Sequence, residues 1–523
     1  MQLQQRFSFA KGRRLFQVAL ALALMWAVQA HVARAADYVV STTGNDGGSG
    51  LAAAPWRTLQ RAWNAGTLRA GDTVTVEDGA YAGFACNGAS GTAAARIVIR
   101  ARNPLGAKIA SPSPSSTQDY IQLTSCSYIT VDGFDVSGAP RSGIAILGNQ
   151  DDGSDARGVT IQNCYSHQNG GATVAGRHDG IFSGFALDLT LQDNHIDGTG
   201  EHGIYVSNAA DNPAILRNLV ENTGANGIQI NADLSTGGDG LISNWRIEGN
   251  VVRNVHGPAG FNLDGAINGV ARNNVIYNAA KGGITLFQGD GAQASHSNVV
   301  VNNTVYDPTG SRAAIQVAEG ANDNIIFNNI LFAPQATGME IQTVTGLVHD
   351  YNFVSSYTGG AASAHESNPA PATLFVSAAT GDLRLVAGGG AVDHGIASMA
   401  GAMAPATDVL GATRPAGAAM DIGAYELGGV TQPGTGGAPG GGAGGSRGAG
   451  GATGAGGAGT GGHAGNTDGG SNDADTTAGA VNGGCGCRTV GPRSSLFASI
   501  LTALAIATCA RRRRRSPVRS KQR

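Results

Sequence analysis

The sequence is poor in charged and in aromatic side chains. Charged residues make up 14% of the 523 positions and aromatic residues 6%, whereas glycine occurs 82 times. Between residues 36 and 427 the only lysines are Lys108 and Lys281. This region therefore lacks the clustered Lys and Arg side chains that nucleic-acid binding requires, and we expect no nucleic-acid partner.

The charges are also unevenly distributed along the chain. Of the 34 basic residues, 5 lie in residues 1–35 and 11 after residue 427, whereas only 3 of the 37 acidic residues lie outside 36–427. The central region thus has 18 basic and 34 acidic residues, a net charge of −16. Carboxylate and amide oxygens can hold Ca²⁺, the cofactor that this composition permits. An acidic polysaccharide would be repelled unless Ca²⁺ or local arginines compensate.

Several catalytic and metal-binding motifs are absent from the central region. It contains no Gly-X-Ser-X-Gly, His-Glu-X-X-His or Walker sequence. Its cysteines, Cys86, Cys126 and Cys164, have no Cys-X-X-Cys or other metal-ligand spacing, so zinc is not expected. We expect all three to be small buried apolar residues, and the alternative is one disulfide with one free thiol.

What the chain does contain is a motif that returns about every two dozen residues. In each copy a short run rich in valine and isoleucine closes on an asparagine. These asparagines are Asn194, Asn218, Asn250, Asn274, Asn303 and Asn329, at steps of 24, 32, 24, 29 and 26 residues. The runs alternate with period two and show no helical stripe, which predicts strands.

Repetition at this period is typical of a solenoid, because one coil cannot bury its apolar face until another stacks on it. We therefore predict an all-β protein, a right-handed parallel β-helix. The asparagines should then stack in register at one turn and hydrogen-bond along a ladder, as amide side chains do in other stacked sheets.

Several segments carry a resemblance to a known group. The segments YVVSTTGNDGGSG, PWRTLQRAWNAGTLRAGDTVTVEDGAYAG, HDGIFSG, EHGIYVSNAADNP, NGIQINAD and DVLGATRPAGAAMDIGAYEL resemble those of secreted bacterial right-handed β-helix proteins related to polysaccharide lyases. The resemblance runs from Asp37 to about Leu427. It implies a short N-terminal capping helix, a closing segment near Leu427, and an extracellular polysaccharide as the partner of a monomeric protein.

The N-terminal end has the composition of a secretory signal peptide. Residues 1–35 contain five basic residues, no acidic residue, the apolar run LFQVALALALMWAV and the sequence Ala33-Arg34-Ala35 before Ala36. We predict a signal peptide over 1–35 and a β-helix domain over 36–427. A transmembrane segment is the alternative for the same apolar run.

The C-terminal end predicts a tether and an anchor. Residues 428–484 consist mainly of Gly, Ala, Ser and Thr and should form a flexible tether. Residues 485–523 combine Cys485-Gly486-Cys487, an apolar stretch and the run Arg511–Arg515, which resembles a MYXO-CTERM sorting signal. A plain C-terminal membrane anchor is the alternative. In both cases we expect secretion and attachment at the bacterial cell surface or outer membrane, with membrane contact only through this anchor.

A candidate site follows from the strands that begin at each Gly-Ile pair. If Ile181, Ile204, Ile228, Phe261, Ile284 and Ile315 point inward, strand alternation sends the flanking positions outward. Neighbouring coils lie about 4.8 Å apart, so these outward residues should form one polar and aromatic field. Its members are Asp179, His202, Tyr205, Asn226, Gln229, Asn231, Asn262 and Asp264. The same positions would also be polar merely to remain hydrated, and that structural interpretation stays open.

The resemblance to polysaccharide lyases implies β-elimination of a uronate-containing glycan, in which a base, often Lys or Arg, removes the proton α to the carboxylate. Lys281 is the predicted base, with His202 and Asp179 as further catalytic residues. Asp179 and Asp264 are the predicted Ca²⁺ ligands, although no compact run of aspartates accompanies them. The predicted substrate-binding residues are Tyr205, Gln229, Asn262, Asn226 and Asn231.

Two other functions stay open. A non-catalytic polysaccharide-binding or adhesive protein would stack sugar rings on Tyr205, Phe182 and Phe287. A glycoside hydrolase on the same fold would need two carboxylates about 5 to 9 Å apart across the scissile bond. The candidate pairs are Asp179 with Glu201 and Asp264 with Asp290.

Overall fold

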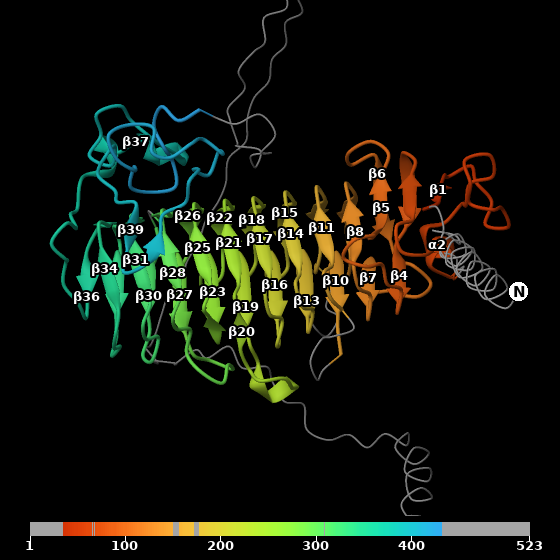
Figure 1. Ribbon diagram of the computed structural model, residues 1–523, viewed down its shortest axis with the longest axis horizontal. Coiled ribbons are helices and arrows are strands. Elements are labelled where there is room, and N and C mark those ends of the chain that lie inside the picture. Colours follow the sequence, from red (N-terminus) through yellow and green to blue (C-terminus); the bar gives the residue numbers. More distant parts are fainter. Residues whose placement is uncertain are drawn as a thin grey trace, which may run out of the picture. The chain divides into compact units, whose positions relative to one another are not determined.

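The computed structural model describes residues 35–430, except 65, 67, 150–155, 172–176 and 308. Three long parallel sheets of 12, 11 and 11 strands make up most of the described chain. The chain visits the three sheets in turn, so each strand pairs with its counterpart one coil away (Figure 1). The predicted parallel β-helix is confirmed. Apart from residues 35 and 428–430, the predicted signal peptide, tether and sorting segment lie outside the described residues.

The three sheets are named here in the order in which the chain meets them. Sheet I contains β1 (Asp37–Val40), β2 (Thr73–Val76), β5 (Ile97–Ala101), β8 (Ile129–Asp132), β11 (Thr160–Gln162), β14 (Thr190–Gln192), β17 (Ala214–Leu216), β21 (Arg246–Glu248), β25 (Val270–Arg272), β28 (Val299–Val301), β31 (Ile325–Phe327) and β34 (Val348–Asp350). Sheet II contains β3 (Gly79–Ala82), β6 (Ala107–Ser111), β9 (Asp135–Ser137), β12 (Tyr165–His167), β15 (His195–Thr199), β18 (Leu219–Thr223), β22 (Val251–Val255), β26 (Val275–Ala279), β29 (Thr304–Tyr306), β32 (Ile330–Phe332) and β35 (Phe353–Val354). Sheet III contains β4 (Phe84–Asn87), β7 (Ile121–Thr124), β10 (Ile144–Leu147), β13 (Ile181–Gly184), β16 (Ile204–Ser207), β19 (Ile228–Asn231), β23 (Phe261–Asp264), β27 (Ile284–Phe287), β30 (Ile315–Val317), β33 (Met339–Ile341) and β36 (Tyr357–Thr358).

The remaining elements are short. Three pairs form separate two-stranded sheets: β20 (Ile242–Ser243) with β24 (Ala266–Ile267), β37 (Phe375–Ser377) with β38 (Asp382–Leu385), and β39 (Ser398–Met399) with β40 (Ala402–Met403). The helices are α2 (Leu59–Asn64) and the 3₁₀ turns η1 (Leu234–Thr236), η2 (Pro371–Thr373) and η3 (Ala378–Thr380). None of these described helices is long and apolar enough to span a membrane.

Inward-facing side chains stack into one apolar core along the solenoid. In sheet III, Ile181 pairs with Ile204, which in turn pairs with Ile228. All six residues predicted to point inward from this sheet are fully buried and follow one another in register. Because side chains alternate along a strand, this register also fixes which residues face outward.

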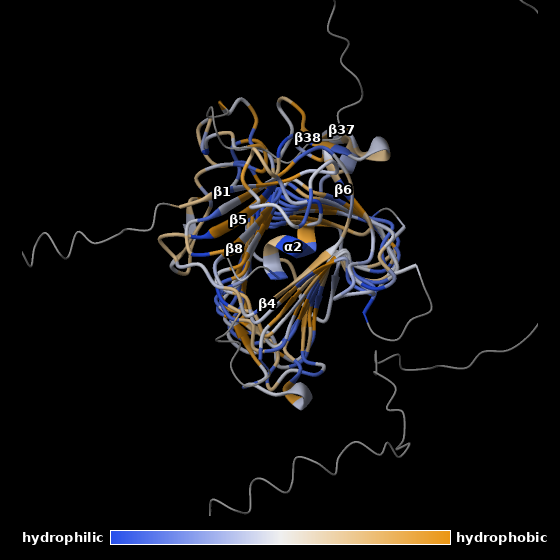
Figure 2. Ribbon diagram, turned by 90° about the vertical axis from the view of Figure 1, so that its right-hand side faces the viewer, coloured by the Kyte–Doolittle hydropathy of each residue, from blue (hydrophilic) through white to orange (hydrophobic). Residues whose placement is uncertain are grey.

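Helix α2 closes the N-terminal end of the core, as the end-on view in Figure 2 shows. Two residues of this helix, Leu59 and Ala62, are buried. The Gln60 side chain accepts a hydrogen bond from the backbone N of Ala85 at 2.8 Å and donates one to the Ala85 carbonyl at 2.9 Å. Gln60 thus satisfies backbone groups of the edge strand β4 that would otherwise be open to another strand. The predicted capping helix is confirmed.

The predicted asparagine ladder runs along the turn between sheets I and II. The Asn274 side chain is typical of it, because its Oδ1 accepts bonds from the backbone N and from Nδ2 of Asn250 at 2.9 and 3.0 Å. In turn, Asn274 donates from Nδ2 to the Asn303 side chain at 2.9 Å and to the Ile247 carbonyl at 2.8 Å. The six predicted members are all linked in this way, and the ladder continues to Asn352.

A buried glutamate ends the ladder. Asn352 donates from Nδ2 to Glu366 Oε1 at 2.7 Å, and the hydroxyl of Tyr357 donates to Glu366 Oε2 at 2.6 Å. Hydrogen bonds from His349, the backbone N of Ser363 and these two groups outweigh burial and lower the pKa of Glu366. An ionised carboxylate is therefore the acceptor that the last amide of the column needs.

The segment that follows β36, the last strand of sheet III, packs against the outer face of sheet II. Leu374, Phe375 and Leu383 form an apolar cluster with Ile330 and Phe332 of that sheet. Figure 1 shows β37 above the last coils, whereas the face around β15 and β18 lies clear of it. The closing segment near Leu427 is held by a fully buried ion pair between Arg414 and Glu426 at 2.9 Å.

Cys86 and Cys126 form a disulfide, and Cys164 is a buried free thiol. The expectation of three unpaired cysteines is therefore wrong, and the alternative of one disulfide is correct. The pair was not evident from the sequence because the two residues lie 40 positions apart and meet only when β4 and the turn after β7 stack.

The first prediction concerns the ladder. Replacing Asn274 with alanine should lower the free energy of unfolding by about 2–4 kcal/mol, because it leaves buried donors of Asn250 without an acceptor. The exposed Asn103, which makes one side-chain bond to Asp78, provides the control, and Asn103→Ala should change the stability by less than about 0.5 kcal/mol. Urea unfolding followed by circular dichroism measures both. Equal losses of stability in the two variants would contradict the proposed contribution of the ladder to the free energy of unfolding.

The second prediction concerns Asp307, whose Oδ1 accepts a bond from the backbone N of Ala279 at 2.9 Å. Burial raises the pKa of Asp307 to about 7 from the usual 3.8. The folded protein holds this proton more tightly than the unfolded chain, so stability is lost as the pH rises from about 4 to 7. Asp307→Asn should therefore gain about 2 kcal/mol relative to the wild type between pH 5 and 8.

Urea unfolding at the two pH values tests this expectation, with the exposed Asp239→Asn as the control. The same gain in the control, or no gain in Asp307→Asn, would show that Asp307 does not govern this pH dependence.

Candidate functional site

The outer face of sheet III carries the predicted polar field. Tyr205 pairs with Gln229, and Gln229 pairs with Asn262, on three successive coils. Gln229 Oε1 accepts hydrogen bonds from Nδ2 of Asn226 at 2.6 Å and from Nδ2 of Asn262 at 2.8 Å. Asn231 Nδ2 contacts the hydroxyl of Tyr205 at 3.2 Å. The structure thus places the five predicted substrate-binding residues on neighbouring coils of one face, in two hydrogen-bonded groups.

A second column lies at the turn that leads into sheet III. Asp179 Oδ1 accepts a hydrogen bond from the backbone N of His202 at 3.1 Å, and His202 Nδ1 accepts one from the backbone N of Asn226 at 3.1 Å. Asn226 Oδ1 accepts one from the backbone N of Ala259 at 2.8 Å. Each side chain satisfies the backbone of the next coil, so all three have a structural role in holding the turn.

This column fixes the tautomer of His202. Because Nδ1 accepts a hydrogen bond, the neutral ring carries its proton on Nε2. Burial lowers the pKa of His202 to about 4 from the usual 6.5. His202 can therefore donate a hydrogen bond through Nε2, whereas accepting a proton there would first require the ring to change tautomer.

Asp179 is fully buried, and its Oδ2 has no hydrogen-bond partner among the described residues. Burial and the nearby charge of Glu201 raise the pKa of Asp179 well above its usual value. A protonated carboxyl is a poor ligand for a hard cation such as Ca²⁺. Its burial also separates it from any sugar on the surface, which weighs against the candidate hydrolase pair with Glu201.

Asp264 lies apart from Asp179. Its carboxylate accepts hydrogen bonds from the backbone N atoms of Gly289, Asp290 and Gly291 and so fixes the loop after β27. Three coils separate the two aspartates, about 14 Å at the usual spacing, and they lie at opposite ends of their strands. The structure therefore does not bring them together, and they do not fit a shared Ca²⁺ site.

Lys281 is exposed at the turn before β27. Its coil lies four steps from the coil of β13, about 19 Å at the usual spacing. It therefore does not share a sugar-sized site with Asp179 or His202.

Two arginines that the sequence analysis did not select lie beside the field. The guanidinium of Arg177 stacks over the ring of Phe182 at 3.7 Å from its centroid, and one of its nitrogens lies 3.6 Å from Asp119. Arg141 forms a tight ion pair with the same buried Asp119. Both arginines lie in turns just ahead of sheet III strands, outside the strand columns from which the prediction was drawn. The sequence did contain one signal for them, because basic residues are few in this acidic domain.

The two arginines have one close carboxylate between them. Arg141 pairs tightly with Asp119, Arg177 lies 3.6 Å from it, and burial and the charge of Glu201 raise the pKa of the neighbouring Asp179. Nε of Arg177 is buried without a hydrogen-bond partner in the described part of the chain. The aromatic rings of Phe182 and Tyr205 meet edge to face at 5.3 Å between centroids next to it. A guanidinium that shares its nearest carboxylate with another arginine and lies beside aromatic rings is suited to an anionic, ring-shaped ligand.

Residues 108–237 match a family model described as a right handed beta helix region. The matched segment runs through the parallel coils from β6 to η1, in agreement with the observed fold. No curated protein matches it.

Among solved structures, the chain is similar to pectate lyase Pel9A, with 17% identity over 75% of this chain and 96% of that one and a TM-score of 0.47. It is also similar to the GH136 lacto-N-biosidase from Eubacterium ramulus, at 14% identity over 64% and 68% of the two chains and a TM-score of 0.41. An alginate lyase from Paenibacillus sp. gives 18% identity over 61% and 99% and a TM-score of 0.42. At these identities the likeness concerns the fold alone.

The third prediction follows from the His202 column. The folded protein resists protonation of His202 down to about pH 4, whereas the unfolded chain accepts the proton near pH 6.5, so stability is lost as the pH falls through this range. His202→Asn should keep the turn, because Asn226 occupies the same position in the next coil. The variant should lose less stability than the wild type between pH 7 and 4.5, as measured by thermal unfolding. Parallel pH profiles of the two proteins would rule out this role.

Proposed function

We propose that the protein cleaves a uronate-containing extracellular polysaccharide by β-elimination, with the glycan lying across the outer face of sheet III. Arg177 carries this proposal, because its guanidinium lies 3.6 Å from Asp119, a carboxylate that Arg141 already pairs with closely. A uronate carboxylate would give Arg177 a partner of its own. The positive charge of Arg177 would also offset locally the repulsion between a domain of net charge −16 and an acidic glycan.

The rest of the field suits the neutral part of a sugar. Tyr205 is partly exposed, and Gln229 and Asn262 place amide groups at the same position on the next two coils. Sugar rings stack on aromatic faces, whereas their hydroxyls bond to amides. A chain lying along the solenoid axis would therefore meet Arg177 and Phe182 first and the amide groups next.

The reaction requires one proton transfer to a base and one to the leaving group. The base removes the proton α to the carboxylate, the freed electron pair forms a double bond to the neighbouring ring carbon, and the glycosidic C–O bond there breaks. The departing oxygen then takes a proton from water, and the base releases its own proton to solvent. For a sugar bound at its own coil, Arg177 would stabilise the negative charge that builds up on the carboxylate during this step.

Lys281 remains the predicted base for a reaction centred on its own coil. Because Lys281 and Arg177 lie four coils apart, they would contact different sugars of one bound chain. Separate variants therefore tell which position serves the reaction. Ca²⁺ has no place in this scheme, since Asp179 and Asp264 do not fit a shared site.

We also propose that the domain works outside the cell. Export by residues 1–35 and attachment through residues 485–523 would hold the β-helix at the cell surface, where polysaccharide is met. Protease treatment of intact cells, with detection of the released domain, tests this placement.

The fourth prediction tests the lyase. Purified full-length protein is incubated with pectate, alginate and glucuronan, with and without chelator, and new absorbance from unsaturated uronate ends is recorded. Arg177→Gln should lower the rate by about 100-fold or more, because the variant loses the charge facing the carboxylate. Arg217→Gln, which breaks a partly exposed ion pair with Asp193 at the turn after sheet I, should leave the rate unchanged.

Each outcome identifies a different function. Lost activity in Lys281→Ala but not in Arg177→Gln would move the reaction to the Lys281 coil. Binding of a uronate glycan without cleavage, weakened by Arg177→Gln, would leave the adhesive function and exclude the lyase. Neither binding nor cleavage across the three substrates would overturn the proposal.

A further inference from the structure

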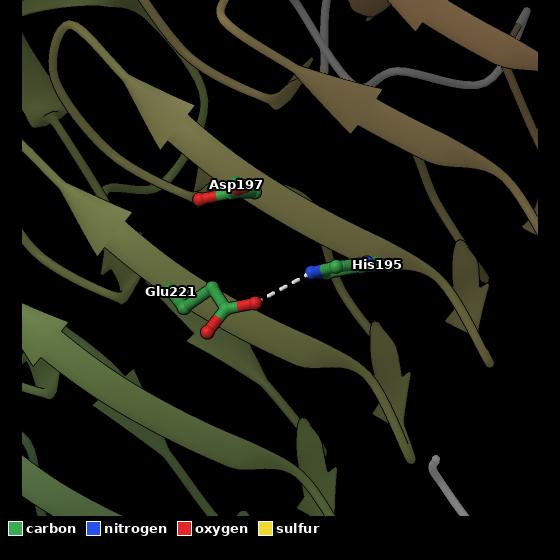
Figure 3. A group of neighbouring side chains, drawn as sticks. All are labelled: His195, Asp197 and Glu221. Atoms are coloured by element: carbon green, nitrogen blue, oxygen red, sulfur yellow. Dashed lines mark hydrogen bonds and ion pairs between the residues drawn. The ribbon is translucent and has the colours of Figure 1, made fainter. Parts of the chain in front are cut away.

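A second group of chemically active side chains lies on sheet II, on another face of the solenoid. Ligand atoms of His195, Asp197 and Glu221 all lie within 4.8 Å of one another. Figure 3 shows the imidazole and the two carboxylates converging from two adjacent strands. All three side chains are partly buried. Among the described residues this is the only such group of three.

The sheet register produces this convergence. His195 and Asp197 are two positions apart in β15 and therefore face the same side, and Glu221 of β18 pairs directly with Asp197. The third ligand, Glu221, comes from the next coil, 24 residues after Asp197. The complete group therefore cannot be recognised in the sequence by a short ligand spacing. The backbone that carries all three is a paired sheet, which holds their positions without a bound ion.

The charges of the group call for a cation. Asp197 and Glu221 are carboxylates in directly opposed positions, an arrangement that costs stability unless the charge is compensated. Arg253 compensates Glu221 alone, through a bond from Nε to Oε2 at 2.6 Å. The hydrogen bonds to the Asp197 carboxylate come from the neutral side chains of Asn222, at 2.7 Å, and Tyr165, at 3.4 Å. Asp197 thus carries a charge that no positive side chain pairs with among its described hydrogen-bond and ion-pair partners.

The surroundings orient each ligand. The ring of Tyr165 stacks on that of His195 at 4.5 Å between centroids. His195 Nε2 lies 2.8 Å from Glu221 Oε1, the oxygen that Arg253 leaves unbound. Asn222 holds Asp197 from the side. Such second contacts are what keep metal ligands in place in established sites.

We propose that His195, Asp197 and Glu221 bind a divalent transition-metal ion of the zinc class on the outer face of sheet II. The mixed set of one imidazole and two carboxylates favours such an ion over Ca²⁺, which prefers oxygen ligands alone. Binding replaces the proton between His195 Nε2 and Glu221 Oε1. In a tetrahedral zinc site the ligand atoms lie roughly 3.3 Å apart, so the 4.8 Å limit leaves only small side-chain rotations to be made.

Three protein ligands leave a coordination position for water or a ligand hydroxyl. The C-terminal segment starts to cover sheet II at Val251 of β22, one coil beyond Glu221, and its apolar packing does not reach β15 or β18 among the described residues. The ion would therefore be reached from solvent and would link two coils that otherwise repel each other through Asp197 and Glu221. The inference does not rest on the proposed function, because no residue of the sheet III site takes part.

Zinc binding to the purified, chelator-treated full-length protein tests the site. Titration calorimetry should give one ion per chain, and a molar excess of Zn²⁺ should raise the melting temperature. His195→Gln and Asp197→Asn should each weaken the affinity by about tenfold or more and abolish the shift. His365→Gln should behave like the wild type, because His365 forms a comparable pair with Asp350 at 2.8 Å that lacks a third ligand.

A second measurement covers the case in which a variant fails to fold. Co²⁺ added to the wild-type protein should give the visible absorption of a low-coordinate nitrogen and oxygen site, and Zn²⁺ should displace it. Absence of zinc binding by the wild type, or binding that persists in both His195→Gln and Asp197→Asn, would overturn the proposal. Arg177→Gln should keep the zinc site whatever its effect on polysaccharide, which separates the two proposals.

Discussion

The structure depends on one constraint, namely that every coil must repeat the backbone of the coil before it. Parallel strands pair only when equivalent residues lie side by side at a spacing of about 4.8 Å. Side chains at the turns enforce this register by bonding the backbone of the neighbouring coil. Asn274 does so between sheets I and II, and His202 and Asn226 do so at the turn into sheet III. Gln60 at one end and Glu366 at the other satisfy groups that have no further coil to bond.

The same constraint decides which polar residues are free for chemistry. A side chain whose acceptor atoms are bound to the next coil is part of the scaffold, whatever its type. Asp179, His202 and Asp264 belong to this class, since each accepts backbone hydrogen bonds. Arg177 lies 3.6 Å from its nearest carboxylate, that of Asp119, and Asp197 has only neutral hydrogen-bond donors. These two are the groups that a ligand or ion would satisfy.

Charge links the two proposed sites. The domain is acidic as a whole, so a local excess of positive charge is uncommon on it. The Arg141 and Arg177 corner places two guanidiniums beside the single carboxylate of Asp119, which suits an anionic sugar, whereas the Asp197 and Glu221 pair places two carboxylates together, which suits a cation. The rigid sheets separate the two sites on different faces, so each keeps its own electrostatic environment.

The sequence alone determined the solenoid, its inward residues and its asparagine ladder, because a period of about two dozen residues and an alternation of two are local patterns. It also determined that Tyr205, Gln229 and Asn262 would share one face, since equal positions in successive repeats must stack. The tertiary structure alone decided how each side chain is satisfied. Arg177 over Phe182, the tautomer of His202 and the meeting of Glu221 with His195 depend on turn geometry and rotamers, which vary from coil to coil and follow no repeat.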